Sequence, residues 1–176
     1  MGFEYVVKDQ GAPYFVTFTV HQWVDVFTRK IYSDLLIESI DYCQQHKGLK
    51  VYAWVIMSNH CHFILQAADE KLSDVIRDFK KFTSKKIFKA IKDNPKESRK
   101  AWLLRALSYK DKIWFWKEGY HGEEIVNSDF FESKLNYIHM NPVKAGIVEK
   151  EEDYLLSSAG FYSGLRSSSI PIAYYD

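Results

Sequence analysis

Hydrophobic and polar positions along this chain change period from one segment to the next. Residues 13–20, PYFVTFTV, alternate β-branched or aromatic side chains well enough to predict a first strand. Residues 49–57, LKVYAWVIM, and 60–67, HCHFILQA, predict two further strands joined by a turn at Ser58-Asn59. The three segments together favour a sheet that contains a β-hairpin.

Two longer segments have helical spacing. Residues 30–48 repeat apolar side chains at that spacing and end in Lys47-Gly48, a basic last turn followed by a stop signal. Residues 71–93 predict a long amphipathic helix that Asn94-Pro95 ends, with lysines facing outward. Its predicted inward face consists of Leu72, Val75, Ile76, Phe79, Phe82, Ile87 and Ile91.

The last third of the chain predicts a fourth strand and a final helix. KIWFWK, residues 112–117, has the composition of a strand, and a loop through Gly119 and Gly122 is expected to follow it. The helix is expected to begin with Ser128 as its N-cap, with Phe130, Phe131 and Leu135 on its inner face. Pro142 follows Asn141, so we expect the chain to turn or restart there.

The element order predicts the fold class α+β, with a ferredoxin-like (split βαβ) antiparallel sheet, helices on one face and an added C-terminal helix. We expect a single domain over residues 1–176. Within it, residues 93–112 are expected to be an insertion, and residues 150–176 a C-terminal segment that wraps the domain.

Composition narrows the class of protein. Apolar residues make up 47% of the 176 positions, which is enough for a packed core. The two cysteines, Cys43 and Cys61, lack metal-binding spacing and are expected to be small core residues of a protein in a reducing compartment. No secretory signal or bilayer-spanning stretch is visible, so we expect a soluble cytoplasmic protein.

Charge is unevenly distributed although the net charge is only +1. Residues 76–112 hold thirteen Lys or Arg against four Asp or Glu, a local surplus of nine positive charges. A solvated, lysine-rich helix face is the commoner explanation of such a run; a phosphate-binding surface is the other. The residues that we predict to bind DNA are Arg77, Lys80, Lys81, Lys85 and Lys86.

Two histidines interrupt the apolar run AWVIMSNHCHFILQ. On a strand, residues i and i+2 point to the same face, so His60 and His62 project together while Cys61 and Phe63 face the helices. Two imidazoles aimed at one point can hold a divalent ion. A surface pair that stacks or forms hydrogen bonds on an open sheet face is the alternative.

The segment LNYIHMNPVKAGIV, residues 135–148, carries a second candidate. In a helix, Tyr137 and Asn141 lie one turn apart on one face, ~6 Å from each other. A tyrosine beside a two-histidine metal site, with an amide oxygen as third ligand, is suited to phosphodiester transfer, with Mg²⁺ or Mn²⁺ as the expected cofactor. Tyr137 as a core aromatic residue with a satisfied hydroxyl is the alternative.

Several segments resemble a known family. SNHCHFIL resembles the His-hydrophobe-His (HUH) motif of single-strand DNA transposases, and YIHMNPVKAGIV is similar to the tyrosine-bearing helix of the REP-associated tyrosine transposases. FKKFTSKKI, WFWKEGYH and EDYLLSSA resemble other segments of that branch, in the same order. The resemblance extends from about Tyr14 to about Tyr162, and the ordered set is far more specific than the His-x-His pair alone.

The resemblance implies roles for individual residues. His60 and His62 would be metal ligands, and Tyr137 the nucleophile that forms a 5′-phosphotyrosine bond and leaves a free 3′-OH. Asn141 stands where relatives have an amide ligand, although related insertion-sequence enzymes have glutamine there. The implied partner is single-stranded, hairpin-bearing DNA from repeated palindromic elements, which would associate the protein with the nucleoid.

Some questions remain open at the level of sequence. A non-catalytic, domesticated ferredoxin-like DNA-binding protein is the alternative function, and either a monomer or a homodimer is compatible with the chain. His121 and His139 are unassigned, with structural and DNA-contact roles equally favoured. Trp114, Phe115 and Trp116 offer stacking faces, but at least half of them must pack inward, so the sequence singles out none of them.

Overall fold

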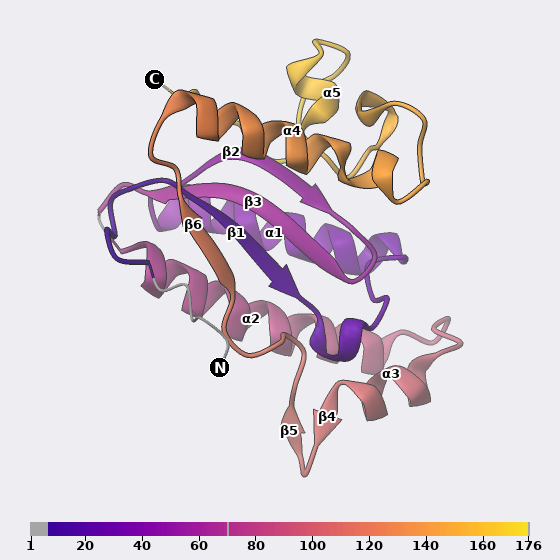
Figure 1. Ribbon diagram of the computed structural model, residues 1–176. Coiled ribbons are helices and arrows are strands. Elements are labelled where there is room, and N and C mark those ends of the chain that lie inside the picture. Colours follow the sequence, from indigo (N-terminus) through magenta and orange to yellow (C-terminus); the bar gives the residue numbers. More distant parts are fainter. Residues whose placement is uncertain (1–6, 70, 176) are drawn as a thin grey trace.

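The computed structural model describes residues 7–69 and 71–175 and has a four-stranded antiparallel sheet at its centre (Figure 1). The strands lie in the order β2-β3-β1-β6, which places the first and third strands in the middle. This order confirms the predicted α+β, ferredoxin-like fold. The strands are β1 (Tyr14–Thr19), β2 (Leu49–Ile56), β3 (His60–Ala67) and β6 (His121–Glu124).

Helices cover both faces of the sheet. Helices α1 (Lys30–His46) and α2 (Leu72–Asp93) lie on one face, and α4 (Ser128–Lys144) crosses the other (Figure 1). The core between the sheet and α1 and α2 contains the buried side chains of Cys61 and Phe63. A smaller apolar cluster lies beneath α4. The strand alternation predicted for residues 60–63 is therefore confirmed, because His60 and His62 lie on the α4 face.

The predicted fourth strand was wrong. Of residues 112–117, only Lys112–Ile113 is a strand (β5), and it pairs with β4 (Ser108–Tyr109) in a separate two-stranded sheet. The edge strand of the main sheet is β6, where Gly122 pairs with Val16 in the segment expected to be a loop. Consecutive aromatic side chains at positions 115 and 116 are both buried, so this segment packs as an apolar loop and does not alternate.

Three details of the predicted helices also differ. Phe82 is exposed, and Thr83 takes its place in the buried stripe because its hydroxyl donates to the Phe79 carbonyl oxygen at 2.7 Å. The N-cap of α4 is Asn127, whose side-chain oxygen accepts from the Phe130 N–H at 2.8 Å. The chain does not turn at Asn141, because α4 continues through Pro142 to Lys144. Pro142 has no N–H, so the helix forgoes one backbone hydrogen bond in its last turn.

The connecting segments gather at two ends of the molecule. Helix α3 (Lys100–Ala106) and the β4–β5 hairpin lie beyond the end of α2, in the region expected to be an insertion (Figure 1). The C-terminal region contains η2 (Glu151–Asp153) and α5 (Ala159–Tyr162). Its backbone bonds to β2 at three points, through the pairs Ile56–Leu156, Trp54–Ser158 and Val51–Ala173. It therefore extends along the free edge of β2.

Burial of the cysteines agrees with the composition. Cys43 and Cys61 are free thiols in the interior, and burial raises the pKa of Cys43 to about 11. Both are small core residues, as predicted. Across residues 7–69 and 71–175, no helix has the length and apolar character needed to cross a bilayer.

Candidate functional site

The two histidines lie side by side on β3, with ring centroids 4.9 Å apart. Their neighbours follow from the antiparallel register: His62 lies opposite Thr17 of β1 and Val55 of β2, and His60 lies opposite Thr19. Residues directly opposite each other share a sheet face. The site is therefore built on the two central strands, on the face that α4 covers.

His62 is held in a fixed orientation. Its side chain is buried, with the ring stacked on Phe15 at a centroid distance of 5.5 Å. Its Nδ1 lies 2.7 Å from the Thr17 hydroxyl, whereas its Nε2 is buried without a hydrogen-bond partner among the described residues. Burial lowers the pKa of His62 to about 3, so the ring is neutral at physiological pH. A neutral imidazole with one unpaired, buried nitrogen needs a partner that the described protein groups do not supply.

His60 is positioned by two asparagines. Its Nδ1 lies 2.8 Å from Asn59 Oδ1, and its ring also forms a hydrogen bond with the side chain of Asn141. Burial lowers the pKa of His60, and the hydrogen bond with Asn141 offsets part of that effect. Asn59 Nδ2 in turn donates to the Trp23 carbonyl oxygen at 3.2 Å. This bond connects the Ser58-Asn59 turn to the segment after β1.

Tyr137 lies beside the histidines. Its ring centroid is 5.2 Å from that of His62 and 5.6 Å from that of Phe15, and its side chain is 41% exposed. The Lys144 ammonium group lies 5.8 Å from the same ring. The packing of α4 against the sheet thus brings Tyr137 and Asn141, one helical turn apart, to the two histidines. All four residues singled out from the sequence meet in space.

The donor set suits a divalent ion with His60, His62 and Asn141 as ligands. Burial favours the neutral form of both imidazoles. With the proton of His62 on Nδ1, toward the Thr17 hydroxyl, the lone pair of Nε2 is available to an ion, and Nε2 has no other partner among the described residues. Within residues 7–69 and 71–175 there is no group of three His, Cys, Asp or Glu that could hold a metal. The third protein ligand would therefore be the Asn141 amide oxygen, which hard ions such as Mg²⁺ accept.

A charged cluster beside the site was missed in the sequence. His121 and Glu123 of β6 share the site face, with His121 Nε2 2.6 Å from Glu123 Oε1. Lys134 of α4 pairs with the same carboxylate at 2.9 Å, and its ammonium group lies 4.6 Å from the Phe15 ring centroid. Because residues 119–122 were expected to be a loop, no sequence signal placed His121 on the sheet.

His139 packs inside the protein, between α4 and the C-terminal segment. Its side chain is buried on the far side of α4, with Nε2 2.9 Å from the Ser158 hydroxyl and the ring 5.2 Å from that of Tyr162. Burial lowers its pKa to about 4. It joins α4 to the C-terminal segment and points away from the Tyr137–Asn141 face.

Comparison with known protein families identifies the family of this chain. Residues 10–141 match the family model described as Transposase IS200 like. The chain belongs to the IS200-like transposase family. The matched range contains His60, His62 and Tyr137 and ends at Asn141, so the whole candidate site lies in the family domain. This result confirms the resemblance to a transposase family that the sequence motifs indicated.

Solved structures that are similar to this transposase-family chain include two transposases. The REP-associated tyrosine transposase bound to a REP hairpin has a TM-score of 0.68 and 21% identity, over 100% of this chain and 94% of that chain. A candidate transposase from Deinococcus radiodurans R1 has a TM-score of 0.47 and 17% identity, over 78% and 92% of the respective chains. No curated protein matches the chain.

The predicted DNA-binding residues of this family member lie on α2, on the sheet face opposite the histidines. Arg77 pairs with Asp74 and Asp78, and Lys86 pairs with Glu38 at 3.3 Å. Lys80 is partly buried and donates to the Lys117 and Gly119 carbonyl oxygens, and burial lowers its pKa to about 8. These three side chains therefore have partners within the protein.

Lys81 and Lys85 have a different setting. With Lys80, Lys112 and Lys117 they line a groove of about 580 Å³ between α2 and the segment from β5 onward. Asp111 and Glu118 also line this groove. Five lysines from two segments far apart in the chain therefore line one surface, which the charge count along the sequence could not reveal.

Proposed function

We propose that this protein is a metal-dependent tyrosine transposase that cleaves and rejoins single-stranded, hairpin-bearing DNA. The observation that carries the proposal is the position of the Tyr137 ring, 5.2 Å from the ring of His62, whose buried Nε2 has no partner among the described residues. A partly exposed phenol beside a two-histidine site is placed for attack on a phosphate group. Membership of a transposase family supports the same conclusion.

The reaction is a direct transfer of a phosphodiester. The Tyr137 hydroxyl releases its proton to solvent as its oxygen attacks phosphorus and forms a bond to the 5′-phosphate. The bond between phosphorus and the 3′ oxygen breaks, and this oxygen takes a proton from solvent and leaves as a 3′-OH. Rejoining is the reverse: a 3′-OH attacks the phosphotyrosine, and the Tyr137 oxygen leaves. Because the number of phosphoester bonds is conserved, the reaction needs no external energy source.

His60, His62 and Asn141 would hold the Mg²⁺ or Mn²⁺ ion. When bound, such an ion supplies positive charge that polarises the phosphate and stabilises charge on the leaving oxygen. The protein groups orient the ligands: Thr17 fixes the ring of His62, and Asn59 fixes that of His60. The buried ring of Phe15 stacks on that of His62 and supports its orientation.

The partner that we propose is single-stranded DNA that carries a hairpin. The REP-associated transposase of similar fold was solved with a REP hairpin. In this chain, the groove lined by Lys81, Lys85, Lys112 and Lys117 offers positive charge for a phosphate backbone. The predicted role of α2 in DNA binding thus stays a prediction, which the groove supports for Lys81 and Lys85.

Tyr137→Phe tests the proposal directly. The purified protein is incubated with Mn²⁺ and a labelled pool of single-stranded oligonucleotides that contain stem-loops, and covalent adducts are resolved on a denaturing gel. We expect wild type to form an adduct and Tyr137→Phe to form none, because only the hydroxyl is lost. Tyr42→Phe, at a 55% exposed position on α1, is the matched control and should behave as wild type.

The alternative function, a domesticated DNA-binding protein without catalysis, is an outcome of the same experiment. If wild type binds stem-loops but forms no adduct with any of them, catalysis is excluded and the alternative stands. An adduct that survives in Tyr137→Phe would instead assign the nucleophile to another residue.

His60→Ala separates the metal site from DNA binding. We expect cleavage to be lost while hairpin affinity, measured by fluorescence anisotropy, stays within about threefold of wild type. The reason is that His60 has protein partners on both sides and would contribute to DNA binding only through the ion. Equal loss of cleavage and binding would mean that the histidine maintains the fold or contacts DNA.

A further inference from the structure

Exposed aromatic side chains gather in a cleft next to the candidate active site. The cleft has a volume of about 540 Å³ and lies between η1 (His21–Trp23), α3 and the β4–β5 hairpin. Trp102 is 52% exposed, Tyr109 62% and Trp114 41%. Its complete lining is His21, Gln22, Trp102, Arg105, Ala106, Ser108, Tyr109 and Trp114.

Burial differs among the three aromatic residues at positions 114–116. Phe115 and Trp116 are 1% and 8% exposed and belong to the core, whereas Trp114 faces the cleft. The ring of Trp114 lies 5.7 Å from that of His21, so η1 and the segment after β5 meet at this wall. Only Trp114 of the three can therefore offer a stacking face.

The chemistry of the lining points to an unpaired base. Tryptophan and tyrosine faces stack on any nucleobase, and a guanidinium group such as that of Arg105 both stacks and neutralises phosphate. None of the eight lining residues is acidic. Five of the eight, from Trp102 to Tyr109, also belong to the stretch from residue 76 to 112 that carries nine surplus positive charges. An anionic, aromatic ligand fits this surface better than an apolar peptide does.

The short helix η1 contacts both the cleft and the histidine site. His21 and Gln22 line the cleft, while the next residue, Trp23, places its ring 5.9 Å from the His60 ring. Gln22 and Trp23 have positive φ angles of 54° and 55°, a left-handed conformation that is strained in a non-glycine residue. A strand that leaves the histidines along η1 would enter the cleft directly.

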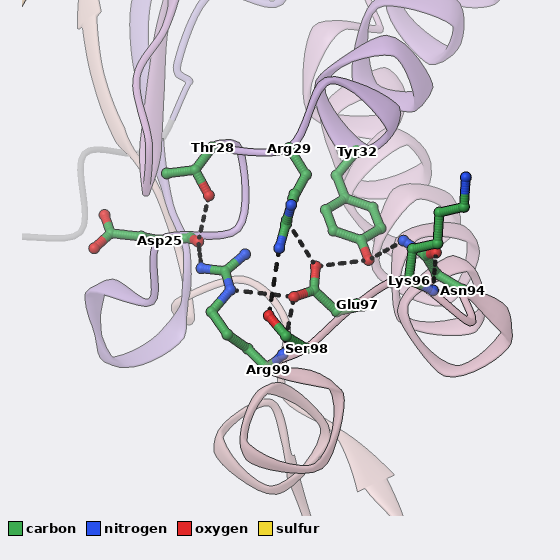
Figure 2. Close-up of polar contacts among 9 residues, drawn as sticks. All are labelled: Asp25, Thr28, Arg29, Tyr32, Asn94, Lys96, Glu97, Ser98 and Arg99. Atoms are coloured by element: carbon green, nitrogen blue, oxygen red, sulfur yellow. Dashed lines mark hydrogen bonds and ion pairs between the residues drawn. The ribbon is translucent and has the colours of Figure 1, made fainter.

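A polar network around the buried Glu97 carboxylate lies at the start of α3, one of the elements that border the cleft (Figure 2). The Glu97 carboxylate pairs with Arg99 at 3.2 Å and with Arg29 at 3.5 Å, and it accepts from the Tyr32 hydroxyl at 3.1 Å. Arg99, which precedes α3, also donates to the Asp25 carbonyl oxygen at 2.9 Å. The network thus joins the start of α3 to α1 and to the segment that follows η1.

We propose that the cleft between η1, α3 and the β4–β5 hairpin binds one or two unpaired bases of the single strand that runs to or from the Tyr137 site. Trp102, Tyr109 and Trp114 stack on the bases, and Arg105 neutralises the adjacent phosphate. The inference rests on the proposed function for the path of the strand, but base binding by the cleft can be tested without catalysis.

The experiment compares two strands of equal charge. Fluorescein-labelled (dT)12 and a twelve-residue abasic strand of the same backbone are titrated against the full-length protein by fluorescence anisotropy. We expect wild type to bind (dT)12 at least about five times more tightly, the ratio that corresponds to ~1 kcal/mol of stacking. Trp102→Ala and, separately, Trp114→Ala should reduce this preference while leaving affinity for the abasic strand unchanged.

Tyr174→Ala is the matched control, because it removes an 80% exposed aromatic side chain from the C-terminal segment, away from the cleft. It should keep the full preference for (dT)12. A (dT)12 strand with 5-iodouracil should also cross-link to residues 102, 109 or 114 on irradiation. Equal binding of both strands by wild type, an unchanged preference in both tryptophan variants, or cross-links confined to other segments would each overturn the proposal.

The two proposals fail separately. Tyr137→Phe should retain the preference for (dT)12, since its ring is not in the cleft. A wild-type preference without any covalent adduct would support the cleft and refute catalysis. An adduct with no preference between the strands would support catalysis and refute the cleft.

Discussion

The imidazole of His62 has one nitrogen in a hydrogen bond and one without a partner in the part of the chain that the structure describes, and this asymmetry defines the site at the scale of single residues. The Thr17 hydroxyl occupies Nδ1, which leaves Nε2 for an external ligand. Partners of this kind orient metal-binding histidines and set their tautomer. The hydroxyl of Thr17 is therefore expected to act on metal affinity although it touches no ion itself.

Thr17→Val removes that hydroxyl with little change in volume. We expect the affinity for Mn²⁺, measured by isothermal titration calorimetry, to fall about 10- to 100-fold because the ring of His62 loses its orienting bond. Thr28→Val makes the same substitution at an exposed position and should leave the affinity unchanged. An unaltered affinity in Thr17→Val would remove Thr17, and with it the Nε2 assignment, from the site.

At the scale of elements, α3 owes its position to one carboxylate. The Glu97 side chain is fully buried between two guanidinium groups and a phenol. Burial by itself would raise the pKa of Glu97, but the hydrogen bonds from Arg99 and Tyr32 outweigh it and bring the pKa below the ordinary 4.5. The charged form is therefore the one that stabilises the folded protein.

Glu97→Gln should lower the free energy of unfolding by about 2–3 kcal/mol at pH 7, because charge-assisted hydrogen bonds are lost. A group whose pKa is lowered on folding stabilises the protein above its unfolded pKa. That stabilisation disappears as the pH falls through the lower, folded pKa. The difference between wild type and variant in urea unfolding should thus be full at pH 7 and shrink below pH 4.5.

Glu38→Gln is the matched control on α1. Its carboxylate is 63% exposed and pairs with Lys86 at 3.3 Å, and such surface pairs contribute little. A Glu97→Gln variant as stable as this control would show that α3 is held by its apolar contacts alone.

At the scale of the whole molecule, the candidate site is complete within one chain. Tyr137 reaches His62 of the same chain because α4 packs across its own sheet through Phe131, Leu135 and Ile138. Exchange of the tyrosine helix between two subunits is not needed to assemble the site. We therefore expect each molecule to act with its own tyrosine.

A mixing experiment tests this expectation. His60→Ala lacks the metal ligand and Tyr137→Phe lacks the nucleophile, so a mixture of the two should form no covalent adduct if each chain uses its own residues. At the same total protein concentration, an equal mixture of wild type and Tyr137→Phe should form half the adduct of wild type alone. Restored adduct formation in the first mixture would demonstrate that α4 is exchanged between subunits.

Much of this architecture was visible in the sequence because it depends on local periodicity. The alternation along residues 60–67 predicted that His60 and His62 share a face, and the helical spacing predicted that Tyr137 and Asn141 do. The ferredoxin-like order followed from the sequence of strands and helices. In each case the signal lies within a few residues of the feature it predicts.

The fourth strand of the main sheet was not predicted correctly, because strand pairing depends on segments far apart in the chain. KIWFWK has a strand-like composition since Phe115 and Trp116 are buried, but the edge of β1 is filled by the polar segment from His121 to Glu124. An edge strand with one exposed side needs few apolar residues and can accept a glycine. For the same reason, the sequence did not predict the cluster of His121, Glu123 and Lys134, which depends on the position of β6.

The sequence by itself determined which side chains share a face, because the geometry of strands and helices repeats over two to four residues. Tertiary structure alone decided which faces meet: that α4 lies over the histidines, that α2 lies behind them, and that Trp114 faces a cleft while its two neighbours are buried. These choices depend on the burial of apolar surface and the satisfaction of polar groups between segments far apart in the chain, which no local pattern encodes.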